Sequence, residues 1–234
     1  MRRSPRTICF MLTALAALLL GTMHPVDATF KMQLSDGSTT TVIGDNQLGD
    51  LTFGTTGLIT FGGTIGNFFV NITLGSSQPL IGSPTNPMLN ITSFSATSSA
   101  GGALTIMLSD TGFGPVGPPA LFTTDLNGTM LPGSVSAQTY FENGTHDFTT
   151  ANLVGSVGPL TGVSSGSDTR VATAGTPFSM NMVVTVAHAG AGVSTFDATA
   201  KATSVPEPGA TLCLGIALFG IGGYAEWQRR KRTI

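Results

Sequence analysis

Short stretches in which apolar and polar side chains alternate fill the middle of this sequence. In residues 68–74, for example, Phe68 and Val70 fall on one face of an extended chain, and Phe69 and Asn71 fall on the other. A repeat of two residues indicates a β-strand that is buried on one side. No stretch of this region combines a helical repeat with helix caps. The pattern therefore predicts an all-β domain.

Ten such strands are predicted, and residues typical of turns separate them. In the stretch 88–96 the alternation places Ser93 on the same face as Leu89 and Ile91. About ten short strands of this kind favour a β-sandwich or a jelly-roll-like fold. The predicted strands are residues 30–34, 39–43, 58–61, 68–74, 88–96, 104–108, 121–126, 135–141, 178–187 and 193–200.

Three other stretches, one of which overlaps the end of the last predicted strand, are predicted to be loops or linkers. Residues 153–177 are rich in Gly, Ser, Thr and Val and are predicted to form a long loop or a poorly ordered insertion. Residues 198–204 are predicted to be a short linker. Residues 112–119 hold three prolines and three glycines, which excludes a helix or a central strand there. A short helix near Ala120 or Thr149 is left open.

The N-terminus has the features of a secretory signal. Basic residues from Arg2 to Arg6 precede an apolar stretch at 8–21, and small residues follow at the end of the segment. We therefore predict that residues 1–28 are a signal peptide and that a signal peptidase cleaves between Ala28 and Thr29. The exported domain is then residues 29–204, which is enough chain for one core-forming domain.

The C-terminus predicts one transmembrane helix. Residues 209–224 carry no charge, and as a helix they would span roughly 24 Å, close to the thickness of a hydrocarbon core. Four basic residues follow and keep that side cytoplasmic, so the exported domain lies across the membrane. This basic cluster is Arg229, Arg230, Lys231 and Arg232.

The order of features in residues 205–234 resembles the PEP-CTERM sorting signal of Gram-negative bacteria. The motif Val205-Pro206-Glu207-Pro208 is followed by the Gly-rich apolar stretch, the basic cluster and the chain end. The resemblance implies recognition at Pro206, Glu207 and Pro208 by exosortase, a membrane protease-transpeptidase. It also implies a link to exopolysaccharide, because such proteins are often encoded beside exopolysaccharide genes. A permanent membrane anchor is the alternative reading of the same segment.

Charge and cysteine content narrow the classes of function. Residues 29–204 carry three basic and nine acidic side chains, a net charge of −6. A negative domain without a basic patch argues against nucleic acid as a partner. Cys9 and Cys213 both lie outside the exported domain, which excludes disulfides and thiolate metal sites in it.

No catalytic grouping is predicted, and no cofactor. Residues 162–166 match the nucleophile-elbow pattern around Ser164, and Asp168 and His188 follow in the order of a hydrolase triad. The elbow needs a strand before it and a helix after it, and the Gly/Ser-rich flanks offer neither. We therefore expect a protein that is not an enzyme. His146, in a turn beside two carboxylates, is expected to be exposed.

Two kinds of binding site are considered for the turns and strands. Asp36, Asp45 and Asp50 are weak candidates for calcium ligands, although their pattern matches neither an EF-hand nor a calcium β-roll repeat. Four Asn-x-Thr sequons occur, and we expect their Asn and Thr side chains to pair across strands or turns, as the two Asn-Gly pairs among them favour turns. The sequons begin at Asn71, Asn90, Asn127 and Asn143.

These features together predict an exported cell-surface or extracellular-matrix protein. Its expected role is structural or interactive in an exopolysaccharide or biofilm matrix, after processing at the Pro-Glu-Pro motif. The alternative is a carbohydrate- or calcium-binding surface module that its C-terminal anchor holds permanently. Sugar binding usually employs exposed aromatic rings, and residues 29–204 contain no Trp and a single Tyr, Tyr140.

Overall fold

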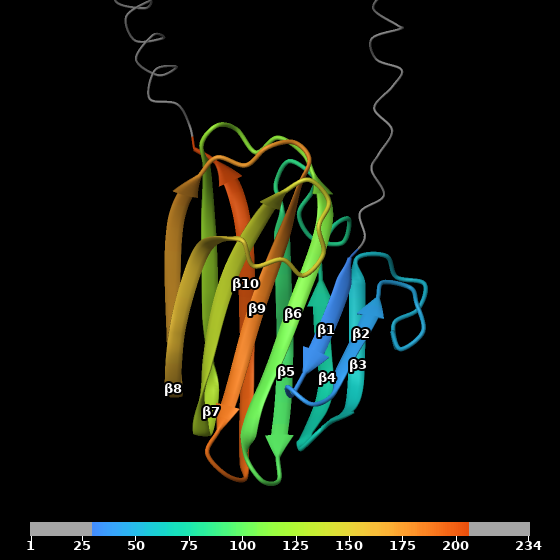
Figure 1. Ribbon diagram of the computed structural model, residues 1–234, viewed down its shortest axis with the longest axis vertical. Coiled ribbons are helices and arrows are strands. Elements are labelled where there is room, and N and C mark those ends of the chain that lie inside the picture. Colours follow the sequence, from blue (N-terminus) through green and yellow to red (C-terminus); the bar gives the residue numbers. More distant parts are fainter. Residues whose placement is uncertain (1–29, 206–234) are drawn as a thin grey trace, which may run out of the picture.

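The computed structural model describes residues 30–205, and within this range the protein is an all-β sandwich without a helix (Figure 1). The strands are β1 (Lys31–Ser35), β2 (Thr40–Gly44), β3 (Leu58–Ile65), β4 (Phe68–Ser76), β5 (Met88–Ser98), β6 (Gly102–Phe113), β7 (Ala120–Asn143), β8 (Asn152–Ala172), β9 (Phe178–His188) and β10 (Gly192–Ser204).

Every strand pairing is antiparallel, and the strand order is β2-β1-β6-β9-β7-β10-β5-β4-β3, with β8 added beside β7. The strand β7 belongs to both layers. Its first part, Ala120–Leu131, pairs with β10, and its second part, Ser134–Asn143, pairs with β9. The chain therefore folds back on itself at Pro132 and Gly133.

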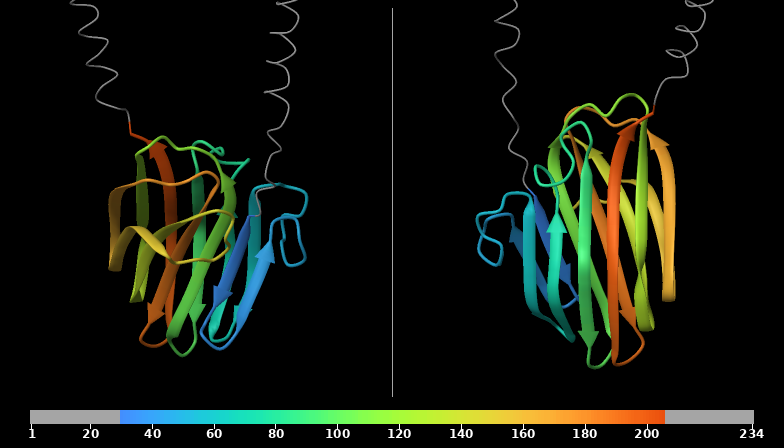
Figure 2. Two further views of the ribbon diagram at one scale, coloured as in Figure 1. Left: turned by 45° about the horizontal axis from the view of Figure 1, so that its top comes forward. Right: turned by 180° about the vertical axis from the view of Figure 1, so that it is seen from behind.

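The sandwich thus has two facing layers joined by a folded ribbon. The first layer contains β2, β1, β6, β9 and the second part of β7; the second contains β3, β4, β5, β10 and the first part of β7. The strand β8 follows β7 through both layers. Figures 1 and 2 show this β7–β8 ribbon along one side of the molecule and β1, β2 and β3 along the other.

The core lies between the layers and is built from the alternate residues that the sequence pattern predicts. Phe68, Phe94 and Phe122 are at most 1% exposed, and the Phe122 ring stacks on Phe141 at 5.3 Å between ring centroids. The prediction of an all-β sandwich is confirmed. Full burial of one such side chain is worth about 1.5–3 kcal/mol, so the aromatic residues contribute strongly to stability.

The prediction of a long loop at 153–177 is wrong, because residues 152–172 form β8. This strand escapes recognition because it pairs only with β7, so it lies at the edge of both layers and many of its side chains are exposed. An edge strand needs no apolar alternation when a long neighbour supplies its hydrogen bonds. The two predicted strands 121–126 and 135–141 are parts of the single bent β7.

Two further boundaries differ from the prediction. The predicted linker at 198–204 belongs to β10, and its residues Ala198, Ala200 and Ala202 are buried. Gly112 and Phe113 complete the central strand β6, and only 114–119 form the connecting loop. Ala120 begins β7 and Thr149 lies between β7 and β8, so neither of the two helices left open is present.

Within residues 30–205, no helix has the length and apolar character needed to cross a membrane. The predicted signal peptide, its cleavage point, the Pro206–Pro208 motif, the apolar stretch 209–224 and the basic cluster all lie outside the residues that the structure describes.

Candidate functional site

The outer surface of the second layer presents two adjacent rows of side chains across four strands. The polar row consists of Asn71, Ser95, Thr195 and Thr129, on β4, β5, β10 and β7 in turn. The strands alternate inward and outward residues, so the inward neighbours fill the core while these side chains face solvent. At about 4.8 Å between strands, the row extends roughly 15 Å.

The second row lies one outward position further along the same four strands. It consists of Phe69, Thr97, Val193 and Leu131. Phe69 is 56% exposed, Val193 45% and Leu131 60%. Exposed apolar side chains in one register row beside a polar row form a surface with both apolar and hydrogen-bonding character. We call the two rows together the outer-face site.

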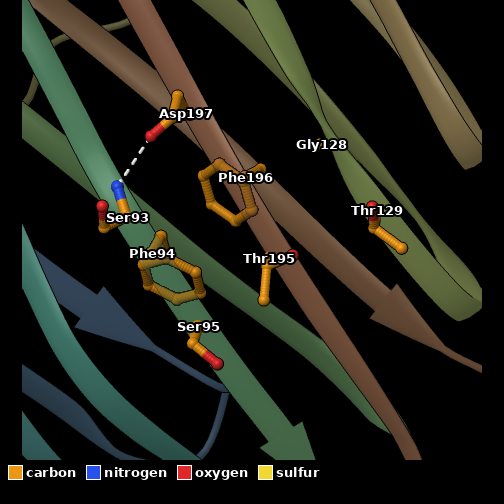
Figure 3. Close-up of a pocket in the computed structure, with 8 residues that line it drawn as sticks. All are labelled: Ser93, Phe94, Ser95, Gly128, Thr129, Thr195, Phe196 and Asp197. Carbon is orange, nitrogen blue, oxygen red and sulfur yellow. Dashed lines mark hydrogen bonds between the residues drawn. The ribbon is translucent and has the colours of Figure 1, made fainter.

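A β-bulge hollows this surface beside the polar row. The register of β5 and β10 shifts between Phe196 and Ala198, and Ser93 has a positive φ of 55°. The Ser93 backbone N–H donates to Asp197 Oδ1 at 2.7 Å, which holds the bulge open (Figure 3). The prediction that Ser93 shares a face with Leu89 and Ile91 is wrong, because the extra residue turns Ser93 to solvent and brings Phe94 into the core.

Phe94 and Phe196 support the hollow from the interior side. Both are buried, at 0% and 3% exposed, and their rings stack with 4.5 Å between centroids. Gly128 lets β7 approach β10 closely here, because a Cβ at this position would lie 2.3 Å from the Thr195 carbonyl oxygen. The expectation that Asn127-Gly128 favours a turn is wrong, because both residues lie within β7.

The hollow has a volume of about 330 Å³, and its lining suits a polyhydroxy ligand. Hydroxyl groups of Ser95, Thr129 and Thr195 surround it, together with the Asp197 carboxylate. Hydroxyls both donate and accept hydrogen bonds, and a carboxylate accepts them. Within residues 30–205, each of the three basic side chains lies within 4 Å of a carboxylate: Lys31–Asp147 at 2.5 Å, Arg170–Asp168 at 3.2 Å and Lys201–Asp125 at 3.9 Å. An anionic ligand would therefore meet no unpaired cation in this part of the chain.

The structure separates the calcium candidates. Asp36 lies in the turn before β2, and Asp45 and Asp50 lie in the loop after it. The backbone N–H of Thr39 and the hydroxyl of Ser38 lower the pKa of Asp36 by donating to its carboxylate. Within residues 30–205, no group of three or more His, Cys, Asp or Glu side chains is arranged to hold a metal ion.

Asp45 and Asp50 serve the geometry of their own loop. Burial raises the pKa of Asp45, and the nearby Asp50 charge adds to this effect. Burial also acts to raise the pKa of Asp50, but hydrogen bonds from Thr52, Thr60 and Asn46 outweigh it and leave the pKa lowered. Asp45 Oδ2 accepts the Gly57 N–H at 2.7 Å.

One buried carboxylate was not singled out from the sequence. Asp110 on β6 is 0% exposed, and burial raises its pKa to about 7. Ser77 Oγ donates to Asp110 Oδ2 at 2.5 Å, and the Thr111 N–H donates to Oδ1 at 2.8 Å. The sequence did contain a sign of its burial, because Asp110 continues the inward-facing series Leu104, Ile106 and Leu108.

The triad order Ser164, Asp168, His188 does not correspond to a catalytic cluster. Ser164 Oγ donates to the Thr161 carbonyl, and Asp168 accepts from Ser156 N–H and Arg170. His188 instead lies at the opposite end of the sandwich from Asp110, with one ring nitrogen 2.6 Å from Ser98 Oγ and the other 2.7 Å from Ser194 Oγ.

A serine beside a histidine can be a nucleophile and its base, but this group is closed to substrate. Ser98, Ser194 and His188 are 1%, 0% and 4% exposed. Burial lowers the pKa of His188, so the neutral ring exchanges hydrogen bonds with the two hydroxyls and fills the end of the core. His146 is exposed, as predicted.

Three of the four sequon asparagines lie on the outer surface of the second layer. Asn90 Nδ2 donates to Thr92 Oγ1 at 2.8 Å, and Asn90 Oδ1 accepts from Thr199 Oγ1 at 3.1 Å, which confirms the predicted Asn–Thr pairing at this position. Asn71 and Asn127 are exposed. Asn143 ends β7, where its Oδ1 accepts the Gly175 N–H at 2.7 Å.

No protein-family model matches this chain, and no curated protein matches it. Among solved structures, the chain is similar to the carbohydrate-binding module TmCBM61 in complex with beta-1,4-galactotriose, with a TM-score of 0.33 and 11% identity over 59% of this chain and 90% of that chain. It is also similar to the enzymatically active domain of the bacteriophage CBA120 tailspike protein 4, with a TM-score of 0.31 and 11% identity over 57% of this chain and 19% of that chain. Similarity at this level concerns the arrangement of strands and carries no information about ligand or activity.

Proposed function

We propose that this chain is an exported, non-catalytic protein of the cell surface or extracellular matrix, and that its sandwich binds matrix exopolysaccharide. The observation that carries the proposal is the outer-face site, in which a row of hydroxyl and amide groups lies beside a second row with three exposed apolar side chains, Phe69, Val193 and Leu131. A sugar ring presents hydroxyls at its edge and C–H groups on its faces, so the two rows complement its two kinds of surface.

Residues 29–204 contain no Trp, but the exposed ring of Phe69 can supply the aromatic contact. It lies one outward position from Asn71 on β4, next to the polar row. Stacking of an aromatic ring on a sugar face contributes affinity, while Ser95, Thr195 and Thr129 provide hydrogen bonds. A site of roughly 15 Å fits several sugar units of a chain rather than a single monosaccharide.

Delivery is the second part of the proposal. A signal peptide at residues 1–28 directs export, and residues 205–234 hold the precursor in the membrane until exosortase acts at Pro206–Pro208. The support is the resemblance to the PEP-CTERM signal and the order of its features in the sequence. Intact-mass analysis of the protein from its native envelope and medium tests this part: masses that begin at Thr29 and end within 205–208 support processing, and a mass that retains the basic cluster refutes it.

Binding is tested by affinity electrophoresis in gels that contain the exopolysaccharide of the native host. The variant Ser95→Ala/Thr129→Ala/Thr195→Ala removes three hydroxyls, each worth about 0.5–1.5 kcal/mol as a hydrogen-bond partner, so binding should weaken roughly tenfold or more. Phe69→Ala should weaken it further.

The first layer offers a matched control. Thr105, Thr185 and Ser136 form an equivalent outward row on β6, β9 and β7. Changing these three residues to Ala removes the same number of hydroxyls from the opposite face and should leave binding unchanged. Equal retardation of both triple variants and the unmodified protein would exclude the outer-face site.

A further inference from the structure

Asp197 is the charged residue in the lining of the hollow beside the polar row. Its Oδ1 accepts the Ser93 N–H at 2.7 Å, which fixes the position of the carboxylate (Figure 3). Among residues 30–205, the other oxygen, Oδ2, accepts no hydrogen bond. Asp197 is half-buried and lines the hollow beside Thr195. The hollow therefore offers a bound ligand an acceptor that is already held in place.

This carboxylate has no cation beside it in the described part of the chain. The three basic side chains of residues 30–205 each pair with another carboxylate. Lys201, which shares β10 with Asp197, pairs with Asp125 and lies four positions away, roughly 13 Å along the strand. That separation exceeds the Debye length of about 8 Å at physiological ionic strength. The hollow is therefore a site of negative charge.

A carboxylate in a sugar site discriminates by the charge of the sugar's substituents. A hydroxyl or an N-acetylated amine donates to it as a neutral group. A protonated amino group donates with a full positive charge, and such a charge-assisted hydrogen bond is roughly twice as strong. A uronate or a sulfate group would bring a like charge to the same point, which is unfavourable. The hollow therefore favours a sugar that carries a free amino group.

The spacing of the polar groups lets one sugar residue contact both kinds of partner. Thr195 and Asp197 occupy consecutive outward positions of β10, about 6.6 Å apart, and Thr129 lies opposite Thr195 on β7. The stacked rings of Phe94 and Phe196 support the hollow from the interior and lower its local polarity, which strengthens an ionic hydrogen bond. A sugar whose hydroxyls contact the polar row thus places a neighbouring amino group near Asp197.

We propose that the polysaccharide bound at the outer-face site is an amino-sugar polymer with free, protonated amino groups, and that the Asp197 carboxylate binds one of these groups. The inference rests on the proposed function, because it concerns the ligand of the same site. It adds a charge requirement: neutral polymers bind more weakly, and acidic polymers are disfavoured. The net charge of −6 on residues 29–204 draws a cationic polymer to the domain, and Asp197 fixes its position on the sheet.

The test is affinity electrophoresis in two gels. One contains the exopolysaccharide of the native host, and the other contains the same polymer after N-acetylation under conditions that spare its hydroxyls. Asp197→Asn removes the charge but keeps an oxygen that can accept the Ser93 N–H, and thermal unfolding checks that the variant is folded. The matched control is Glu142→Gln, which removes one charge from an outward position of β7 in the first layer.

N-acetylation of the polymer should weaken binding of the unmodified protein about tenfold, the difference between a charged and a neutral hydrogen bond. Asp197→Asn should weaken binding by a similar factor in the untreated gel and have little effect in the N-acetylated gel. This dependence of one change on the other isolates the contact between carboxylate and amino group. Glu142→Gln should behave like the unmodified protein in both gels.

The comparison of the two gels with the unmodified protein decides the matter even if Asp197→Asn does not fold. Equal retardation of the unmodified protein in both gels, with weaker retardation of Ser95→Ala/Thr129→Ala/Thr195→Ala, would overturn the amino-sugar requirement and leave the outer-face site intact. No retardation of the unmodified protein in either gel would overturn the proposed function and this inference with it.

The variants give two further results that would overturn the inference. Equal weakening by Asp197→Asn in both gels would show that Asp197 supports the bulge rather than an amino group of the ligand. Equal weakening by Glu142→Gln and Asp197→Asn in the untreated gel would show that the polymer responds to the net charge of the domain and not to the hollow.

Discussion

Asp110 should make the protein less stable as the pH rises from 4 to 7, and Asp110→Asn should abolish this effect. The carboxyl group is completely buried at the end of β6, and burial is the main cause of its raised pKa. The charges of Asp45 and Asp147 act in the same direction. The hydrogen bonds from Ser77 and Thr111 oppose the shift but do not outweigh it.

The magnitude follows from the difference between the two pKa values. The folded chain holds the proton with a pKa of about 7, whereas the ordinary value is 3.8. A difference of this size corresponds to roughly 4 kcal/mol at 1.36 kcal/mol per pKa unit. Because the folded state binds the proton more tightly, the stabilisation is complete below pH 3.8, declines as the pH rises, and is lost above about 7. For a domain of this size that loss lowers the Tm by roughly 10 °C.

The assay is thermal and urea unfolding of residues 29–205 at several pH values between 4 and 8. The measured quantity is the difference in unfolding free energy between Asp110→Asn and the unmodified protein. This difference cancels the contribution of His188, whose lowered pKa makes stability increase with pH below about 6.5 in both proteins. The variant keeps one oxygen, which can accept the Thr111 N–H, and its NH2 group replaces Oδ2 and can donate to Ser77 Oγ. Its advantage should therefore grow with pH and level off near 7. Ser109→Ala, an equally buried neighbour without a titratable group, should change stability equally at every pH. Parallel curves for Asp110→Asn and the unmodified protein would show that the burial argument is wrong.

Three further predictions concern packing and the sheet edge. Gly128→Ala should destabilise the fold by about 1–3 kcal/mol in urea unfolding, because its Cβ would meet the Thr195 carbonyl oxygen at 2.3 Å. The control Gly190→Ala, with no atom within 4 Å of the new Cβ, should be close to neutral. Equal effects of the two changes would contradict the close approach of β7 and β10. His188→Ala should cost about 2–4 kcal/mol, since it leaves a cavity and two buried hydroxyls without their ring partner, and an unchanged unfolding midpoint would show that the group is not part of the core. Asp168→Ala should cost little stability, but it frees the Ser156 N–H on the edge strand β8. The variant should therefore self-associate more in sedimentation experiments, while Asp125→Ala should not. Identical sedimentation of the two variants would argue against edge protection by Asp168.

The outer-face site could be predicted only in part. The alternation around residues 68–74 correctly places Phe69 and Asn71 on the face opposite the core. Nothing in that stretch indicates that Ser95, Thr195 and Thr129 continue the row. Those residues come from strands up to 124 positions away in the sequence, and their alignment follows from the register of β4, β5, β10 and β7.

Prediction from local sequence also fails where a β-bulge inserts one extra residue and reverses which side chains of a strand point inward. The bulge at Ser93 depends on a hydrogen bond to Asp197, which is distant in the chain. Similarly, β8 carries no strong pattern of its own and is a strand because β7 pairs with it along almost its full length. A pairing partner can impose an extended conformation on residues whose own preference is weak, since β-propensity depends on cross-strand context.

The sequence by itself determined the all-β class, most strand positions and the negative net charge of residues 29–204, because side-chain alternation and charge can be read from the residues directly. The tertiary structure decided the folded β7–β8 ribbon, the burial of Asp110, the enclosure of His188 by two serines and the assembly of the outer-face site. Each of these depends on contacts between strands far apart in the chain, and such contacts are set by register and layer packing rather than by any local pattern.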